Sequence, residues 1–223
     1  MGAVLELMAA ASGLPGTVMI FRGFLTLWQT GVLVHDIQVT LARCLVGWSV
    51  GAALGVVLGL STGRSAPVRS LLEGFLVLCR AVPFISLLPL TTRLVGLTET
   101  GKFFLVAWAS ATVSWIVIHD RALNVPQVLL WRARSLGIST SRWVRQILIP
   151  ACSEGIYSGL RASLSLGLIV VAVAEMSGVY ERSTGLWWSE GLGYRLFRSL
   201  DESRDDLLLA SILSIAALGI ALD

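Results

Sequence analysis

Few residues in this sequence have the types and spacing that catalysis requires. His35 and His119 are isolated in the sequence, and no G-x-x-x-x-G-K-[ST] segment is present to hold a nucleotide phosphate. His119 precedes Asp120 at the end of an apolar segment, where an interfacial cap is a simpler interpretation than a catalytic base. Three cysteines lie far apart without metal-ligand spacing and are interpreted as small core residues: Cys44, Cys79 and Cys152. The sequence therefore predicts no catalytic residue and no metal site.

Two charged residues within apolar segments, Glu175 and Arg161, are the remaining candidates for chemistry. An unpaired carboxylate in hydrocarbon costs about 2–4 kcal/mol even on lenient scales, so such groups commonly face a pathway or a partner. We expect Glu175 to do one of these, or else to lie close to the external headgroups.

The composition places these residues in a membrane protein. Hydrophobic residues make up 55% of the 223 residues and charged residues only 14%, and the mean hydropathy is +0.79. The formal charge of +3 and the pI near 9.1 come from basic residues scattered between apolar runs. That pattern favours contact with membrane lipid and does not indicate a nucleic-acid partner.

The apolar segments predict an all-α, polytopic fold. A membrane-spanning helix needs roughly 20 mostly apolar residues. Five segments qualify, the second of them broken by Pro83 and Pro89: 38–62, 68–97, 101–118, 155–176 and 206–222. Polar residues interrupt 17–36, which we interpret as an amphipathic helix at the membrane interface. The chain is therefore divided into an N-terminal interfacial segment, 1–36, and a transmembrane domain, 37–223.

The distribution of arginine between the loops predicts the orientation. Loops 63–69 and 119–154 carry an excess of arginine, whereas 177–205 has no positive excess. Because positive loops remain in the cytoplasm, the first two loops are expected to be cytoplasmic and the third external. Five spans then place the N-terminus outside and the C-terminus inside.

Small residues recur every four positions in two of the spans. The first row is Gly47, Gly51, Gly55, Gly59 and Gly63, and the second is Gly155, Gly159, Ser163 and Gly167. Residues four apart lie only about 40° apart around a helix, so each row forms one groove where another helix can approach closely. The rows predict a tightly packed bundle.

The loop 119–154 has the signals of two short helices. Asn124 and Pro126 favour a helix start, Gly137 suits its end, and 139–141 offer a cap for a second helix that Pro150 would stop. Its second helix has an apolar face of Val144, Ile147 and Leu148 and a polar face of Arg142, Arg145 and Gln146. The pattern fits a docking element for a protein partner or a basic loop resting on anionic headgroups.

Several segments resemble one family of membrane proteins. "ARSLGIS" and "ILIPACSEGIYSGLRASL" are similar to the EAA loop of binding-protein-dependent ABC importer permeases, with Ala133, Gly137 and Pro150 at matching positions. "TLARCLVGWSVGAALGVVLGLSTGRS", "CRAVPFISLLPL", "VAVAEM" and "GLGY" resemble segments of the nitrate, sulfonate, taurine and bicarbonate branch. The resemblance covers residues 15–223.

This resemblance implies a type I ABC importer permease fold and a set of partners. A second permease subunit, in a homodimer or heterodimer, would complete the pathway, and a periplasmic or lipid-anchored binding protein would deliver a small, anionic solute. Two cytoplasmic ATPase subunits would bind ATP and Mg, so this chain would bind no cofactor and would not be an enzyme. Residues 127–148 would form the coupling helices that contact the ATPases, in a bacterial inner membrane.

The sequence departs from the family pattern in the loop and near its end. Trp131 and Arg132 occupy the positions of the glutamate and first alanine of the EAA triplet. Either Gly185 or Gly191 could begin the GLG signature, and the distance to the last span favours Gly191. Trp187 and Trp188 would face a partner or the membrane interface. The altered triplet leaves open the alternative that this chain is a non-transporting, permease-like structural partner. The charges within the apolar segments leave open a stand-alone transporter or channel, although no inverted repeat supports that alternative.

Overall fold

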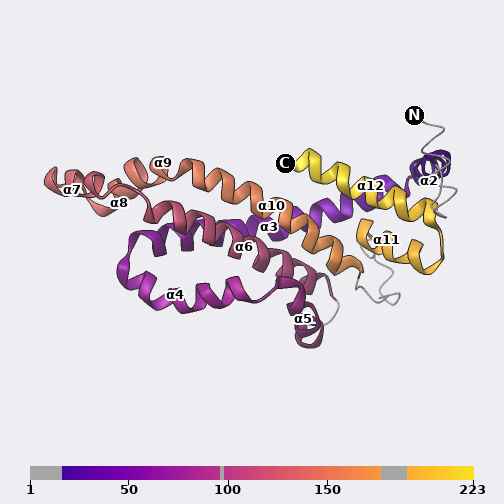
Figure 1. The fold of residues 1–223 in the computed structure, drawn as a ribbon, viewed down its shortest axis with the longest axis horizontal. Helices are drawn as coiled ribbons and strands as arrows, with labels where there is room; N and C mark the ends of the chain where they lie inside the picture. Colours follow the sequence, from indigo (N-terminus) through magenta and orange to yellow (C-terminus); the bar gives the residue numbers. More distant parts are fainter. Residues whose placement is uncertain (1–16, 96–97, 177–189) are drawn as a thin grey trace.

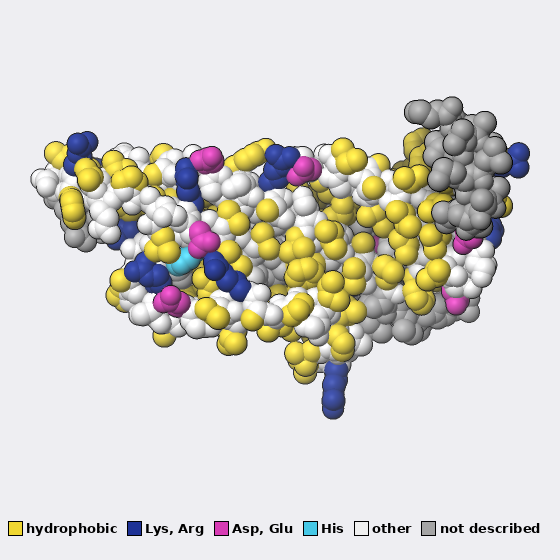
Figure 2. All heavy atoms as spheres, viewed as in Figure 1, with side chains coloured by type: hydrophobic (Ala, Val, Ile, Leu, Met, Phe, Trp, Pro, Cys, Tyr) yellow, Lys and Arg dark blue, Asp and Glu magenta, His cyan; other side chains and the backbone are white. Residues whose placement is uncertain are grey.

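The computed structural model describes residues 17–95, 98–176 and 190–223, and every regular element within these ranges is helical. Three long helices form the centre of an elongated bundle: α3 (Val32–Arg64), α6 (Glu99–Leu123) and α10 (Ser153–Met176) (Figure 1). Together with α12 (Asp205–Leu222), they are long and apolar enough to cross a membrane. Apolar side chains cover much of the middle of the face shown in Figure 2, as a lipid-facing surface requires.

The segment predicted as a broken span is a bent pair of helices. α4 (Ala66–Ala81) is followed by the 3-10 turn η1 (Phe84–Leu87) and by α5 (Leu88–Val95), with a 91° bend at the break. If this pair is one span, the described helices provide five spans. Pro83 lies at the break, in extended backbone before η1. Pro89, by contrast, is the second residue of α5, where its missing N–H requires no partner, so it does not break a helix.

The N-terminal helices differ from the sequence expectation. α2 (Thr17–Gln29) ends before Gly31, which has a φ of 72°, and α3 then begins at Val32. A single interfacial helix over 17–36 is therefore wrong. Asp36 belongs to α3 and is only 1% exposed. It lies inside an apolar helix because an arginine from a distant part of the chain neutralises it.

Glycines bring α3 against the backbone of α6. A Cβ at Gly47 would lie 2.7 Å from the Cβ of Val106, and one at Gly55 would lie 2.6 Å from the Cβ of Ser114. Gly51, Gly59 and Gly63 face α6 in the same way. The first glycine row is therefore the contact surface between the two helices, and side chains larger than hydrogen do not fit there.

The second row brings α10 against α6 beside α3, so that Val106 and Ile118 of α6 meet glycines of both helices. A Cβ at Gly155 would lie 2.6 Å from the Cβ of Arg121, and one at Gly167 would lie 3.3 Å from the Oγ of Ser110. Ser163 is fully buried, and its Oγ accepts a hydrogen bond of 3.0 Å from the indole of Trp48 on α3. The three long helices are thus joined by small residues and a few polar contacts.

The connections lie at opposite ends of the bundle. The α3–α4 turn and the segment between α6 and α10 are at one end, whereas α2, α11 (Leu192–Asp201) and the start of α12 are at the other (Figure 1). α2 packs on α12 so closely that a Cβ at Gly23 would lie 2.6 Å from the carbonyl oxygen of Asp206. The end that contains the α3–α4 turn and the segment between α6 and α10 includes both arginine-rich loops, 63–69 and 119–154. The sequence therefore predicts that this end is the cytoplasmic one.

Candidate coupling element and buried ion cluster

The segment between α6 and α10 begins with a helix that ends in a left-handed turn. α7 (Gln127–Ser135) is followed by Gly137, which has a φ of 62°. The backbone N–H of Ile138 donates to the carbonyl oxygen of Ala133 at 3.0 Å, as in a Schellman turn. Gly137 therefore ends the first short helix, as the sequence predicts, and its backbone conformation is one that L side chains rarely adopt.

The second short helix continues through Pro150. α8 (Thr140–Trp143) leads into the π-helical turn η2 (Val144–Leu148) and α9 (Ile149–Ala151), and α10 starts at Ser153. The N–H of Ile149 donates to the carbonyl of Val144, five residues back. The prediction that Pro150 stops the helix is wrong, because the wider turn before it accommodates the ring and the missing N–H. α7, α8, η2 and α9 are hereafter the α7–α9 element.

The inner side of the α7–α9 element packs on the ends of the long helices. Ala133, Trp143 and Leu148 are 2–4% exposed and form an apolar cluster with Ala122 and Cys152. The guanidinium carbon of Arg64, at the end of α3, lies 4.3 Å from the centre of the Trp143 ring. The element is therefore fixed to α3, α6 and α10 together.

The outer side of the α7–α9 element combines apolar and basic side chains. Trp131 is 60% exposed and Leu136 is 75% exposed. Most of the predicted contact residues are also exposed: Arg132, Gly137, Arg142, Arg145 and Pro150. Ala133 points inward instead. No acidic residue occurs between Asp120 and Glu154, so the exposed surface is basic around an apolar patch.

At the opposite end, Glu175 of α10 is buried against donors from two other helices, α3 and α11. Its carboxylate accepts hydrogen bonds from Arg43 Nη1 at 2.8 Å, from Thr40 Oγ1 at 2.9 Å and from the backbone N–H of Gly193 at 3.0 Å. Glu175 is 1% exposed and Arg43 is fully buried. The expected partner donor is therefore Arg43 on α3. Arg161, the other charged candidate, is exposed and pairs with Asp223.

Glycine is required where α11 meets this carboxylate. A Cβ on Gly191 would lie 2.6 Å from the carboxyl carbon of Glu175. Gly193 lies against the carbonyl of Ala172 and donates its N–H to Glu175. The preferred GLG position, Gly191 to Gly193, is the one that contacts Glu175, while Gly185, Trp187 and Trp188 lie outside the described residues.

Arg43 also binds a second carboxylate. Its Nε and Nη2 donate to the two carboxylate oxygens of Glu99 at 2.6 and 2.7 Å, and Lys102 Nζ donates to Glu99 at 2.8 Å. The ion cluster, defined as Arg43, Glu99, Lys102 and Glu175, thus joins α3, α6 and α10. Its two acids and two bases balance in charge.

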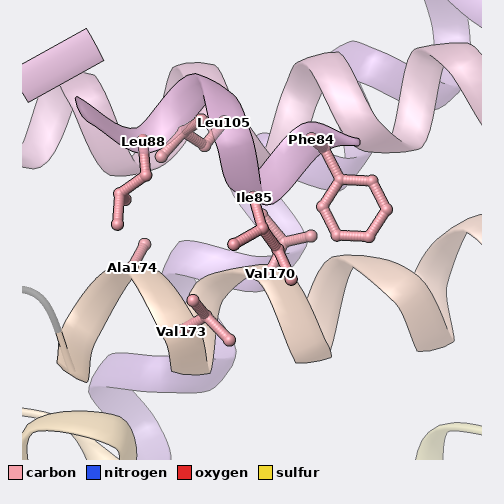
Figure 3. Close-up of a pocket in the computed structure, with 7 residues that line it drawn as sticks. All are labelled: Phe84, Ile85, Leu88, Leu105, Val170, Val173 and Ala174. Atoms are coloured by element: carbon pink, nitrogen blue, oxygen red, sulfur yellow. The ribbon is translucent and has the colours of Figure 1, made fainter. Parts of the chain in front are cut away.

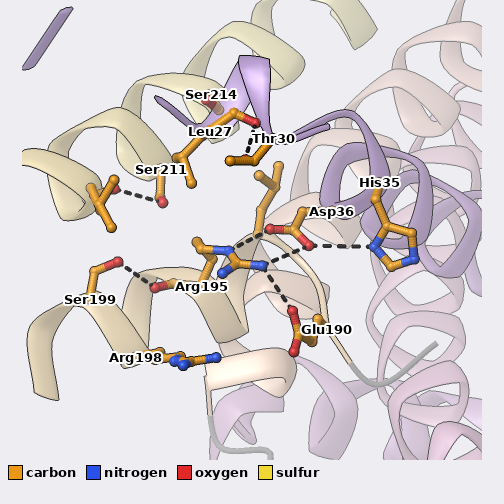
Figure 4. A network of polar contacts seen from close by, with 12 residues as sticks. Leu27, Thr30, His35, Asp36, Glu190, Arg195, Arg198, Ser199, Ser211 and Ser214 are labelled. Carbon is orange, nitrogen blue, oxygen red and sulfur yellow. Dashed lines mark hydrogen bonds and ion pairs between the residues drawn. The ribbon is translucent and has the colours of Figure 1, made fainter. Parts of the chain in front are cut away.

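A neighbouring network attaches α11 to α3. Arg195 Nε donates to Asp36 at 2.7 Å, and Arg195 Nη2 donates to Glu190 at 2.9 Å (Figure 4). Burial opposes ionisation of Arg195, but the hydrogen bond and charge of Asp36 outweigh it and raise the pKa of the guanidinium. Asp36, Thr40 and Arg43 are spaced four and three residues apart, so they form one polar stripe on α3.

The sequence analysis did not identify this polar stripe. Asp36 fell in the predicted interfacial segment, 1–36, and Arg43 fell within the first predicted span, 38–62, without being singled out. The signal was present in the spacing, because the stripe leads directly into the glycine row on the same helix. Similarly, His119 is not an interfacial cap: it is 6% exposed, and its Nδ1 lies 2.8 Å from the hydroxyl of Thr62 on α3.

Comparison with known proteins identifies the family. Residues 51–223 match the family described as binding-protein-dependent transport system inner membrane component. The chain belongs to this family. This permease chain is 29% identical over 210 residues to the Probable ABC transporter permease protein BMEII0107 of Brucella melitensis biotype 1, covering 94% of this chain and 82% of the relative.

A named transport permease is also similar. The Taurine transport system permease protein TauC of Escherichia coli K12 is 27% identical over 204 residues, which cover 91% of this permease and 69% of TauC. The resemblance to the sulfonate and taurine branch is therefore confirmed.

Solved transporters share the fold of this permease. A chain of the MetNI methionine ABC transporter in an inward-facing conformation has a TM-score of 0.71 and 20% identity, over 85% of this chain and 90% of that one. An amino acid ABC transporter has a TM-score of 0.64 and 18% identity, over 89% and 91% of the two chains. The type I ABC importer permease fold expected from the sequence is confirmed.

Proposed function

We propose that this permease is one of two membrane subunits of an ATP-driven importer for a small organic anion. Two cytoplasmic ATPase subunits would hold ATP and Mg, and an external binding protein, periplasmic or lipid-anchored, would deliver the solute. The chain itself would bind no nucleotide. Taurine, which the name of TauC gives as its transported solute, carries a sulfonate, and this supports a solute with a negatively charged group.

The observation that carries this proposal is the two-sided construction of the α7–α9 element. Its inner side is packed against the ends of α3, α6 and α10, whereas Trp131 and Leu136 on its outer side have no apolar cover. A short helical unit fixed to three spans can transmit displacement, and its exposed basic rim complements an acidic partner surface. We therefore assign ATPase contact to residues 127–148, with Trp131 replacing an acidic contact by an apolar one.

The distribution of arginine supports the orientation of the assembly. The α7–α9 element and the α3–α4 turn share one end of the bundle and contain the arginine-rich loops. This end would face the cytoplasm, and the α11 end would face the binding protein. The C-terminus would be cytoplasmic.

The buried acid gives little support to a stand-alone transporter. Such a transporter would use Glu175 as an accessible group, but its carboxylate is enclosed by Arg43, Thr40 and Gly193. Arg161 is exposed and forms its ion pair with Asp223, so it is not one of the residues that enclose Glu175. The enclosed Glu175–Arg43 pair is better suited to holding α3 and α10 together.

The assembly can be tested by purification and mass measurement. Two permease copies, or two different permeases, are expected with two ATPases. Replacing Arg142 and Arg145 by alanine should weaken ATPase docking most at low salt. The difference from the parent should shrink as salt rises, because exposed charges are screened within about 10 Å at 0.1 M. The matched control replaces Arg198 and Arg204, which are exposed at the opposite end, and should leave docking unchanged.

Trp131→Glu provides a second test of the same contact. It restores the acidic residue of the family pattern and should weaken docking, because a carboxylate would enter a surface that now receives an indole. If the arginine variants and Trp131→Glu all bind and stimulate the ATPases like the parent, the α7–α9 element rests on the membrane surface. A transport-competent monomer would contradict the two-subunit assembly.

A further inference from the structure

The carboxylate of Glu99 is held in the way that a protein holds a bound anion. Arg43 donates two parallel hydrogen bonds to its two oxygens, at 2.6 and 2.7 Å, and Lys102 adds a third at 2.8 Å. A guanidinium matches carboxylates and other planar or tetrahedral oxyanions through this fork geometry. Arg43 and Lys102 therefore form an oxyanion site whose occupant is part of the chain itself.

The two acids of the ion cluster differ in how easily they can leave. The side chain of Glu175 is 1% exposed, whereas that of Glu99 is 37% exposed. Glu99 can turn toward water and regain hydration, which offsets the loss of its ion pairs. Departure of Glu99 would remove one negative charge from beside Arg43 and Lys102. The resulting positive charge favours replacement of Glu99 by another anion.

An apolar hollow adjoins the ion cluster. η1 and α5 contribute Ile85 and Leu88, α6 contributes Leu105, and Ala174 on α10 lies across from them (Figure 3). Leu105 lies about one turn after Lys102 on α6, and Ala174 precedes Glu175 on α10. The apolar hollow therefore begins about one helical turn from Lys102 on α6, while Arg43, the other member of the cationic pair, is on α3.

The helices that cover this hollow pack on the central bundle mainly through partly buried side chains, among them Phe84, Leu87 and Leu88. η1 has no buried residue, and in α5 only Thr91 is buried. The hollow can therefore widen by displacement of η1 and α5 without opening the glycine contacts of α3, α6 and α10. An anion with a short apolar tail would place its charge on Arg43 and Lys102 and its tail beneath η1.

We propose that Arg43 and Lys102 bind the anionic group of a small carboxylate or sulfonate, and that Glu99 fills this site until the solute displaces it. This assignment rests on the proposed function, because it makes the ion cluster a binding site for the imported anion at the external end of the bundle. Glu99 is then an internal competitor. Its removal should raise affinity, whereas loss of a residue that only stabilises the fold would lower it.

The test uses the detergent-purified permease with its co-purifying subunits and ethanesulfonate as the probe. Glu99→Gln should bind ethanesulfonate at least tenfold more tightly than the parent in isothermal titration, and ethylammonium should not bind. Lys102→Gln should weaken binding severalfold, since Lys102 contributes a positive charge to the site. Glu202→Gln, at an exposed acid paired with Arg198 at the same end, is the matched control and should match the parent.

Equal affinity of the parent and Glu99→Gln would overturn the proposal and make Glu99 a permanent structural tie. The same conclusion would follow if Lys102→Gln bound ethanesulfonate as tightly as Glu99→Gln. ATPase co-purification is scored separately in each variant. Failure to recover ATPases would count against the proposed function, whereas ATPase recovery without the affinity change would count only against the anion site.

Discussion

Replacement of Gly55 by alanine tests the packing of α3 on α6. In a helix, alanine is favoured over glycine by about 1 kcal/mol, so substitution at an open position should stabilise the fold. At Gly55 the new Cβ would lie 2.6 Å from the Cβ of Ser114 and 2.7 Å from the carbonyl oxygen of Ala111. Ordinary contacts begin at 3.4 Å, so the two helices must separate locally by nearly 1 Å.

This separation cannot be confined to one residue. Gly51 and Gly59, one turn away on either side, also lie against the backbone or Cβ atoms of α6 and would lose contact. Overpacking of this kind costs about 1–3 kcal/mol. Gly55→Ala should therefore lower the unfolding temperature, by roughly 2–4 °C for each kcal/mol in a chain of this size.

Thermal unfolding of the detergent-solubilised protein, followed by tryptophan fluorescence, measures this effect. Gly74→Ala is the matched control, because a Cβ at Gly74 on α4 meets nothing within 4 Å. Gly74→Ala should leave the unfolding temperature unchanged or raise it. Equal unfolding temperatures for the two variants would refute the assignment of the glycine row as a close helix contact.

Two further substitutions test the ion cluster and the α7–α9 element. Glu175→Gln removes the enclosed negative partner of the buried Arg43 guanidinium and should lower the free energy of unfolding by about 3–5 kcal/mol, measured as a lower yield of folded protein. Adding Arg43→Met should recover part of that yield. No recovery would show that the two residues are not coupled. Gly137→Val places a β-branched residue at a φ of 62°, which costs about 1–2 kcal/mol of backbone strain. The variant should uncouple ATP hydrolysis from transport without reducing membrane insertion. Normal coupling in this variant would exclude a mechanical role for the turn.

Local sequence patterns predicted the features that depend on local geometry. A four-residue repeat of small residues places them on one face of a helix, so the close contacts of α3 and α10 followed from the sequence. Gly137 followed from the preference of the left-handed region for glycine. Family resemblance was also sufficient for the fold, since the core motifs occur in the expected order.

Features that depend on contacts distant in sequence were not predictable in this way. Asp36 was treated as the end of an interfacial segment because its partner, Arg195, is 159 residues away. Arg43 and Glu175 are 132 residues apart, so neither position indicated the other. Pro150 was misjudged for a different reason: a π-helical turn can accommodate a proline that an α-helix would exclude.

The glycine contact between α3 and α6 also limits how the bundle can deform. Flexible side chains between two helices can change rotamer and absorb a displacement, but contacts made largely by backbone and Cβ atoms have no such freedom. α3 is 33 residues long, or about 50 Å, and it carries Arg64 against Trp143 at one end and Arg43 in the ion cluster toward the other. If the α7–α9 element were displaced, α3 would transmit the movement from Trp143 along its length as a rigid helix, and Arg43, which holds Glu99, would move with it.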